Sequence, residues 1–156
     1  MSVAMRKSPP LMRSDVVDVV VRMHAAVAVC DFESVRLCFW DDAVWECPGN
    51  GPFGGRHVGW EAIRDDLLAL PELLSGGTYL AELLDAATGD EYVVAVLHAT
   101  AEYRGNSLDV TDCQLIRVVD GRIREIRSHV SDVAAVDAFW CWESVEHPPL
   151  AEVAAD

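Results

Sequence analysis

Hydrophobic and polar residues alternate between Tyr92 and Val130, and two short breaks divide this stretch into three runs. Alternation with a period of two is typical of β-strands, whose successive side chains point to opposite faces of a sheet. The breaks, Gly105-Asn106 and Asp120-Gly121, supply residues that tolerate a positive φ, so each predicts a tight turn between antiparallel strands. The pattern therefore predicts an antiparallel meander of three strands.

Both faces of this predicted meander are mixed in polarity. One face carries Val93, Ala95, Leu97, Ala99, Ala101, Leu108, Val110, Asp112, Gln114, Ile116, Val118, Arg124, Ile126, Ser128 and Val130. The opposite face includes Val94, Val96, Leu115, Val119 and Ile123, together with His98 and His129. A mixed face on each side predicts a lined cavity on one side of the sheet and a protein contact on the other.

Helical periodicity appears earlier in the chain. After a good N-cap at Ser14, four apolar residues recur on one stripe: Val16, Val20, Met23 and Val27. This stripe predicts a helix that packs on the sheet, and His24 at its edge is interpreted as a structural residue. The run DFESVRLCFWDD predicts a second short helix that ends at Asp41-Asp42. The run WEAIRDDLLALPELL predicts a third helix, broken at Pro71.

The remaining segments complete one predicted domain. AVWEC predicts a strand that stops at Pro48, and the glycine-rich stretch that follows, up to Gly59, is interpreted as a flap over a ligand. TYLAELLDAAT predicts a strand beside the meander, and Asp132 caps a last helix that buries Phe139 and Trp140. We expect the domain over residues 14–142, with a loose arm at 1–13 and a tail at 143–156.

Composition narrows the expected partners and compartment. A formal net charge of −14 disfavours phosphate backbones and anionic lipids, so we expect neither nucleic acid nor a membrane surface as a partner. The start of the chain lacks the apolar core of a signal peptide and no apolar run is long enough to span a bilayer, which predicts a cytoplasmic protein. The 5 cysteines form no CxxC pair, which argues against a disulfide framework and against a zinc site.

The order of these elements resembles the cone-shaped α+β barrel of the nuclear transport factor 2-like superfamily. RMHAAVAVCDFESVRLCFWDDAVWECP is similar to the opening of the ketosteroid isomerases, and HVGWEAI to the start of their third helix. AEYRGNSLDVTDCQLIRVVDGRIREIRSHVSD is similar to the second half of the SnoaL-like polyketide cyclases. The resemblance implies a strongly bent antiparallel sheet packed by helices around a hydrophobic cavity, and chemistry without a cofactor or metal.

Other residues occupy the family's catalytic positions in this chain. By the resemblance, the isomerase's general base falls on Cys47, its phenol donor on Met23 and its protonated Asp on Gln114. Of these three residues, Gln114 alone retains a side-chain group that can donate a hydrogen bond to the substrate oxygen. The acid/base Asp of the SnoaL-type cyclases falls on Ser128, and the Asp-Arg-Asp set of the limonene epoxide hydrolases has no counterpart.

The same alignment surrounds the inferred cavity with a set of lining residues. They are Met23, Trp45, Cys47, His57, Leu97, Ala99, Ala101, Ile126 and Ser128. The two small alanines leave room beside Trp45, so the implied ligand is bulky, ring-shaped and mostly apolar. Cys47 is interpreted as a small wall residue rather than a nucleophile, and His57 as a residue of the flap.

Asp112 is the candidate proton carrier because it points to the same side as Gln114. A carboxylate in an apolar barrel has a raised pKa, which suits a general base near neutral pH. The alternatives are a carboxylate at the wet rim of the barrel and one paired with Arg124.

Two functional hypotheses follow. The first is a cofactor-independent cyclase, isomerase or dehydratase acting on a polyketide-like or polycyclic ketone, in which Asp112 moves the proton and Gln114 stabilises the enolate oxygen. The second is a non-catalytic protein that binds a hydrophobic small molecule in the same cavity. In either case, the apolar residues of the opposite sheet face predict a homodimer.

Overall fold

The computed structural model of the protein describes residues 13–141. The predicted tail, and the predicted arm apart from Arg13, lie outside the described residues. The elements are α1 Arg13–Ala28, α2 Phe32–Leu37, β1 Phe39–Cys47, β2 Gly55–Val58, α3 Trp60–Ala62, η1 Ile63–Ala69, α4 Leu70–Leu74, β3 Leu80–Thr88, β4 Val93–Tyr103, β5 Asn106–Val119, β6 Arg122–Val130 and α5 Val133–Trp140. The predicted α+β fold is confirmed.

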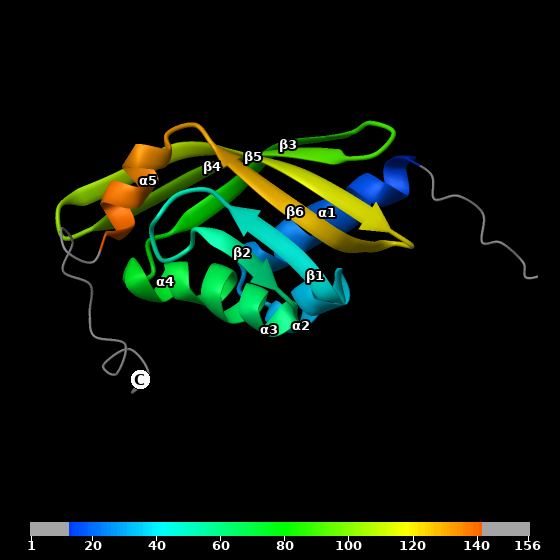
Figure 1. The fold of residues 1–156 in the computed structure, drawn as a ribbon, viewed down its shortest axis with the longest axis horizontal. Coiled ribbons are helices and arrows are strands. Elements are labelled where there is room, and N and C mark those ends of the chain that lie inside the picture. Colours follow the sequence, from blue (N-terminus) through cyan, green and yellow to red (C-terminus); the bar gives the residue numbers. More distant parts are fainter. Residues whose placement is uncertain (1–12, 142–156) are drawn as a thin grey trace, which may run out of the picture.

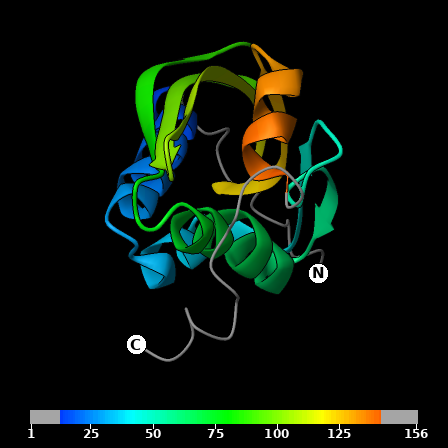
Figure 2. The same cartoon turned by 90° about the vertical axis from the view of Figure 1, so that its left-hand side faces the viewer.

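One bent sheet of six strands, in the order β2-β1-β6-β5-β4-β3, forms one side of the molecule (Figure 1). Neighbouring strands are antiparallel except β1 and β6, which are parallel. Figure 2 shows the sheet curving around the interior, with α1 and the helix of residues 60–74 closing the other sides. The hydrophobic core fills this interior, where Met23 from α1 and Ile116 from β5 are both 0% exposed. No helix within residues 13–141 is long and apolar enough to cross a membrane.

The predicted meander is present, with one turn displaced by a residue. Asp120 and Gly121 form the second turn with φ values of 48° and 80°, as predicted. In the first turn the positive φ values belong to Arg104 and Gly105, at 47° and 82°, because Asn106 already pairs with Tyr103. Each of these two-residue turns has a positive φ at both positions, which matches the twist of the flanking strands.

A bulge in β6 overturns two of the predicted side-chain directions. Arg117 pairs with Glu125, whereas its neighbour Val118 pairs with Ile123, so β6 carries one extra residue at this point. An extra residue reverses the inside–outside alternation from there on. Ile123 therefore lies in the core at 0% exposure instead of on the outer face. Arg124 faces outward and binds Asp42 at 2.6 Å, instead of facing the cavity.

The second helix ends earlier than predicted, because β1 begins at Phe39. Phe39 is 2% exposed and stacks on Trp45 with ring centroids 6.3 Å apart, so apolar burial favours the strand here. The exposed Asp41 and Asp42 are tolerated within the strand because Arg36 and Arg124 pair with them. Part of the predicted flap forms β2, which pairs with β1.

The helix of residues 60–74 is continuous, so the predicted break at Pro71 is wrong. The segment η1 is a π-helix, in which each N–H bonds five residues back rather than four. Pro71 follows this π-helical segment directly, within the first two positions of α4, where the hydrogen-bond spacing changes from five residues to four. The proline is therefore accommodated without ending the helix.

The last helix forms as predicted. The Asp132 side chain accepts a hydrogen bond of 2.9 Å from the Ala135 N–H, which caps the start of α5. Phe139 and Trp140 at its other end are 4% and 3% exposed. Because α5 contacts β5, these rings close one end of the interior.

Candidate functional site

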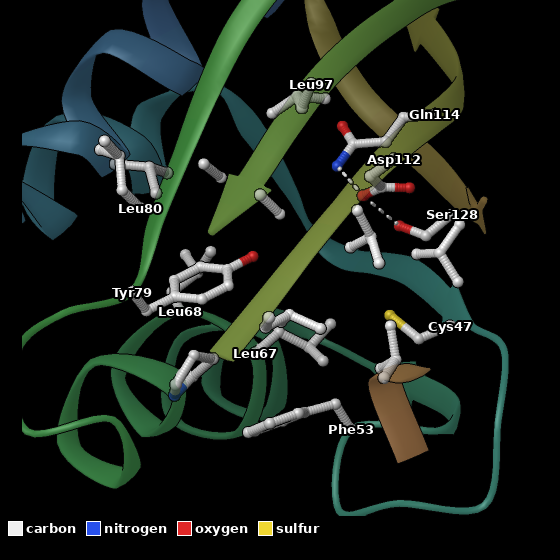
Figure 3. Close-up of a pocket in the computed structure, with 18 of the residues that line it drawn as sticks. Cys47, Phe53, Leu67, Leu68, Tyr79, Leu80, Leu97, Asp112, Gln114 and Ser128 are labelled. Atoms are coloured by element: carbon white, nitrogen blue, oxygen red, sulfur yellow. Dashed lines mark hydrogen bonds between the residues drawn. The ribbon is translucent and has the colours of Figure 1, made fainter. Parts of the chain in front are cut away.

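A cavity of about 160 Å³ opens on the concave side of the sheet (Figure 3). Its walls come from α1, β1, the flap, the helix of residues 60–74, strands β3 to β6 and α5. Most of the lining is apolar, and exposed residues such as Cys30 and Leu80 form its mouth. An apolar cavity of about 150 Å³ holds a molecule the size of benzene. The enclosed part therefore accepts one ring, and a larger ligand must extend through the mouth.

Asp112 lies in the wall of this cavity on β5. Its Oδ2 atom accepts hydrogen bonds from Gln114 Nε2 at 3.0 Å and from Ser128 Oγ at 3.2 Å. Its Oδ1 atom is buried and has no hydrogen-bond partner among the described residues. Burial raises the pKa of the Asp112 carboxyl, and hydrogen bonding from Gln114, from Ser128 and from the His129 backbone partly offsets the rise. Arg124 is not its partner, because that guanidinium binds Asp42.

Gln114 joins Asp112 to His24, a histidine for which the sequence predicts a structural role. Gln114 is 3% exposed, and its Oε1 lies 3.0 Å from His24 Nε2 on α1. Burial lowers the pKa of His24 to about 4, so the ring is neutral at pH 7. The predicted enolate donor thus has its amide engaged on both sides. No local pattern indicated this contact, since 90 residues separate the two side chains.

Ser128 links Asp112 to the aromatic wall. The Trp45 indole N–H donates to Ser128 Oγ at 3.0 Å, and both residues line the cavity. Cys47, two residues further along β1, lines it as well. Burial and the negative charge of Asp112 raise the pKa of the Cys47 thiol to about 12, so at neutral pH it is not the thiolate that a nucleophile requires.

Tyr79 lines the cavity as well and lies outside the set of site residues predicted from the sequence. Figure 3 shows its hydroxyl pointing across the cavity towards Asp112. Within residues 13–141 this hydroxyl has no hydrogen-bond partner, whereas the Tyr79 backbone N–H is held by Ser75 Oγ at 2.9 Å. Burial and the charge of Asp112 raise the pKa of the phenol, so it stays a donor at neutral pH. Its position just before β3 carried no sequence signal.

The structure brings seven of the predicted site residues to one cavity: Trp45, Cys47, Leu97, Ala99, Asp112, Gln114 and Ser128. Met23 and Ile126 are 0% exposed and Ala101 is 2% exposed, and they pack in the core away from it. His57 also lies outside the cavity, because β2 folds back on β1 and its Nε2 bonds the Phe53 carbonyl at 2.9 Å. These four residues do not meet the predicted ligand space.

Metal-binding geometry is absent from residues 13–141, which contain no group of three or more His, Cys, Asp or Glu side chains arranged around a common point.

Comparisons with known proteins agree on the fold. The sequence profile of the SnoaL-like domain matches residues 20–126. A search of the curated proteins found no match.

Three solved structures illustrate the likeness. Bal32a, from a soil-derived mobile gene cassette, is 32% identical with a TM-score of 0.78, and the match covers 82% of this chain and 98% of Bal32a. An NTF2-like protein from Burkholderia xenovorans is 20% identical with a TM-score of 0.68, covering 81% and 97%. TerC, co-crystallised with polyporic acid, is 17% identical with a TM-score of 0.68, covering 79% and 96%. The last two show the fold alone.

Proposed function

The chain belongs to the SnoaL-like family of NTF2-like fold, and on this premise we propose that it is an enzyme that moves a proton within a ring-shaped ketone. Proteins of this fold bind small hydrophobic ligands, and the apolar cavity fits such a ligand. The proposed reaction class is that of a cofactor-independent cyclase, isomerase or dehydratase. The proposed substrate is a polyketide-like or polycyclic ketone whose reacting ring enters the cavity.

The unpartnered Oδ1 atom of Asp112 is the observation that carries this proposal. Leaving a buried acceptor without a hydrogen bond costs about 1–3 kcal/mol, so such an atom in a native fold calls for an explanation. A ligand that donates to Oδ1, or gives it a proton, provides one. Burial moves the pKa of Asp112 upwards, in the direction of neutral pH, and a general base is most effective when its pKa lies near the working pH.

The proposed chemistry begins with the C–H bond next to the ketone. Its proton moves to Asp112, and the electron pair of that bond moves into the carbonyl to give an enolate. The Tyr79 hydroxyl would donate a hydrogen bond to the ligand oxygen, which is the role first assigned to Gln114. Gln114 and Ser128 instead hold the carboxyl group, and the walls at Trp45 and Leu97 exclude water.

TerC lends the proposal limited support. It shares the fold with this chain and was co-crystallised with polyporic acid, so this fold accommodates a small organic molecule.

Hydrogen–deuterium exchange tests the proposal without knowledge of the natural substrate. A bicyclic ketone such as 1-tetralone is incubated with the protein in D₂O, and loss of the proton signals next to the carbonyl is followed by NMR. We expect the protein to accelerate this loss and Asp112→Asn to slow it by about two to four orders of magnitude, the usual weight of a general base. Binding, measured by tryptophan fluorescence, should change little.

Asp109→Asn is the matched control, because it makes the same charge change on the same strand. The Asp109 side chain is 76% exposed and binds His98, away from the cavity. Exchange unaffected by Asp112→Asn would remove Asp112 from the mechanism. Ketone binding without any accelerated exchange would favour the alternative, a non-catalytic binding protein. That alternative is supported by the residues at the family's acid and base positions, which are Met23, Cys47 and Ser128 in this chain.

A further inference from the structure

Five polar side chains form one continuous hydrogen-bonded chain across the cavity wall. In order they are His24, Gln114, Asp112, Ser128 and Trp45, contributed by α1, β5, β6 and β1. The four residues that flank Asp112 are each between 3% and 8% exposed. Buried chains of this kind persist when each member is satisfied, because an unpaired member is costly in a medium of low polarity.

The donors on both sides of this chain point towards Asp112. An indole N–H can only donate, so Ser128 Oγ accepts from Trp45 at 3.0 Å and turns its own proton to Asp112 Oδ2 at 3.2 Å. On the other side, Gln114 donates its N–H to the same Oδ2 at 3.0 Å. Its carbonyl oxygen then faces His24, whose Nε2 must carry the hydrogen. The hydrogen bonds from both sides of the chain therefore end on Oδ2 of Asp112.

From this polarity we propose that His24 is a positioning residue that orients the Gln114 amide, so that Oδ2 of Asp112 is reserved for structural bonds and Oδ1 alone exchanges the proton. Oδ2 already accepts two hydrogen bonds, whereas Oδ1 is buried with no partner within residues 13–141. The proposal deepens the proposed function, on which the catalytic use of Oδ1 rests. The orientation of the chain can be tested without any substrate.

The contribution of His24 follows from the symmetry of an amide group. Rotation of Gln114 by a half turn would exchange its N–H for its carbonyl oxygen at nearly the same position, and would bring that oxygen against Oδ2. Two acceptors in contact disfavour the ionised carboxylate. The Nε2–H form of His24 disfavours the rotation, because the flipped amide would point its N–H at the His24 N–H unless the ring moved its hydrogen to Nδ1. His24 is neutral at pH 7, since burial lowers its pKa to about 4.

Other titratable groups near Asp112 bear on the test. Cys47 from β1 and Tyr79 before β3 keep their protons near neutral pH, because burial raises the pKa of each. His129 from β6 is a neighbour whose backbone N–H, and whose ring charge when the ring is protonated, favour the ionised form of Asp112. His98 lies on the outer face and binds Asp109, so its replacement is a control that leaves the chain untouched.

The experiment measures the titration of Asp112 directly. Protein labelled with ¹³C at the aspartate carboxyls is titrated by NMR, and the Asp112 signal is identified by its absence from Asp112→Asn. We expect His24→Leu to raise the Asp112 midpoint by about one to two pH units, which corresponds to losing one hydrogen bond to a charged group. His24→Gln keeps an N–H in reach and should restore most of the wild-type value, and His98→Leu should leave it unchanged.

A second measurement covers the case in which His24→Leu does not fold. The ¹⁵N shifts of the His24 ring in the wild-type protein report which nitrogen carries the hydrogen, and the proposal requires Nε2–H. A hydrogen on Nδ1, an unchanged midpoint in His24→Leu, or equal shifts in His24→Leu and His24→Gln would each overturn the proposal. None of these results depends on catalysis. Failure of the ketone-exchange experiment would therefore be recognised separately.

Discussion

Single polar residues at the cavity owe their charge state to burial. His24 and Cys47 both sit where water is scarce, and the neutral form of each is favoured: the pKa of the histidine falls to about 4, and that of the thiol rises to about 12. Asp112 responds in the same sense, with a raised pKa. His24 and Cys47 are therefore neutral towards an apolar ligand at pH 7, and Asp112 is the group proposed to exchange a proton.

Stability should depend on His24 as the pH falls. The unfolded chain protonates this histidine below pH 6.5, whereas the folded chain does so only near pH 4, so acid favours the unfolded state. The pKa difference corresponds to about 3 kcal/mol of unfolding free energy, lost between pH 7 and pH 4. We expect His24→Gln, which cannot titrate, to lack this part of the pH dependence in urea unfolding.

Comparison of the two proteins isolates the histidine. The raised pKa of Asp112 acts in the opposite sense, because the folded state then binds the extra proton and acid stabilises it. Asp112 is present in both proteins, so its contribution largely cancels in the difference. Parallel curves for wild type and His24→Gln would contradict the lowered pKa.

Among the elements, the flap and α5 are joined by one carboxylate. Asp137 on α5 accepts hydrogen bonds from the Asn50 N–H at 3.0 Å and 3.1 Å and from the Gly51 N–H at 3.1 Å. Close by, Phe53 of the flap meets Trp140 edge to face, with centroids 4.9 Å apart. Phe53 and Trp140 both line the cavity, so this contact between flap and helix closes one side of the ligand space.

Removal of this carboxylate should loosen the flap. We expect Asp137→Ala to lower the free energy of unfolding by about 1.5–3 kcal/mol, because hydrogen bonds to a charged acceptor are lost. Association and dissociation of a cavity ligand, followed by stopped-flow fluorescence, should both become faster. Asp41→Ala is the control: its side chain is 81% exposed in a surface ion pair, so it should cost less than about 1 kcal/mol. Equal effects of the two substitutions would argue against the contact.

For the whole molecule, we propose a homodimer through the outer face of the sheet. On this face Val94, Val96 and Leu115 are half-buried, and Val119 is 39% exposed. Ile123, which was predicted for the same face, lies in the core instead. We expect sedimentation at micromolar concentration to give about twice the 17.1 kDa of one chain. Val96→Arg should shift the protein towards the monomer, because a charge at the centre of an apolar contact is costly.

Val21→Arg serves as the control for this substitution, since Val21 is 42% exposed on α1, outside the sheet face. A wild-type protein that sediments as a single chain would end the proposal.

The amino-acid sequence determined the features of this fold that arise between near neighbours in the chain. The alternation from Tyr92 to Val130 and the turn at Asp120-Gly121 specify a three-stranded antiparallel meander. Its exact register is not local, because Leu97 pairs with Asp112 through the displaced first turn and Gln114 pairs with Ser128 through the β6 bulge. The cap at Asp132 and the apolar stripe of α1 are, like the alternation itself, local features. They led to the correct family and to Asp112 in the cavity wall, because the two-residue period decides which side chains share a face.

Tertiary structure alone decided which polar side chains meet in the cavity and which way the side chains of β6 point. The β6 bulge turned Ile123 inward and Arg124 outward, because one extra residue in a strand is fixed by its partner strands and not by its own pattern. His24 acquired its role from Gln114, 90 residues away, and Tyr79 faces Asp112 because β3 lies next to β4 at the edge of a curved sheet. Contacts between distant segments depend on packing of the whole chain, so no local pattern of residues indicates them.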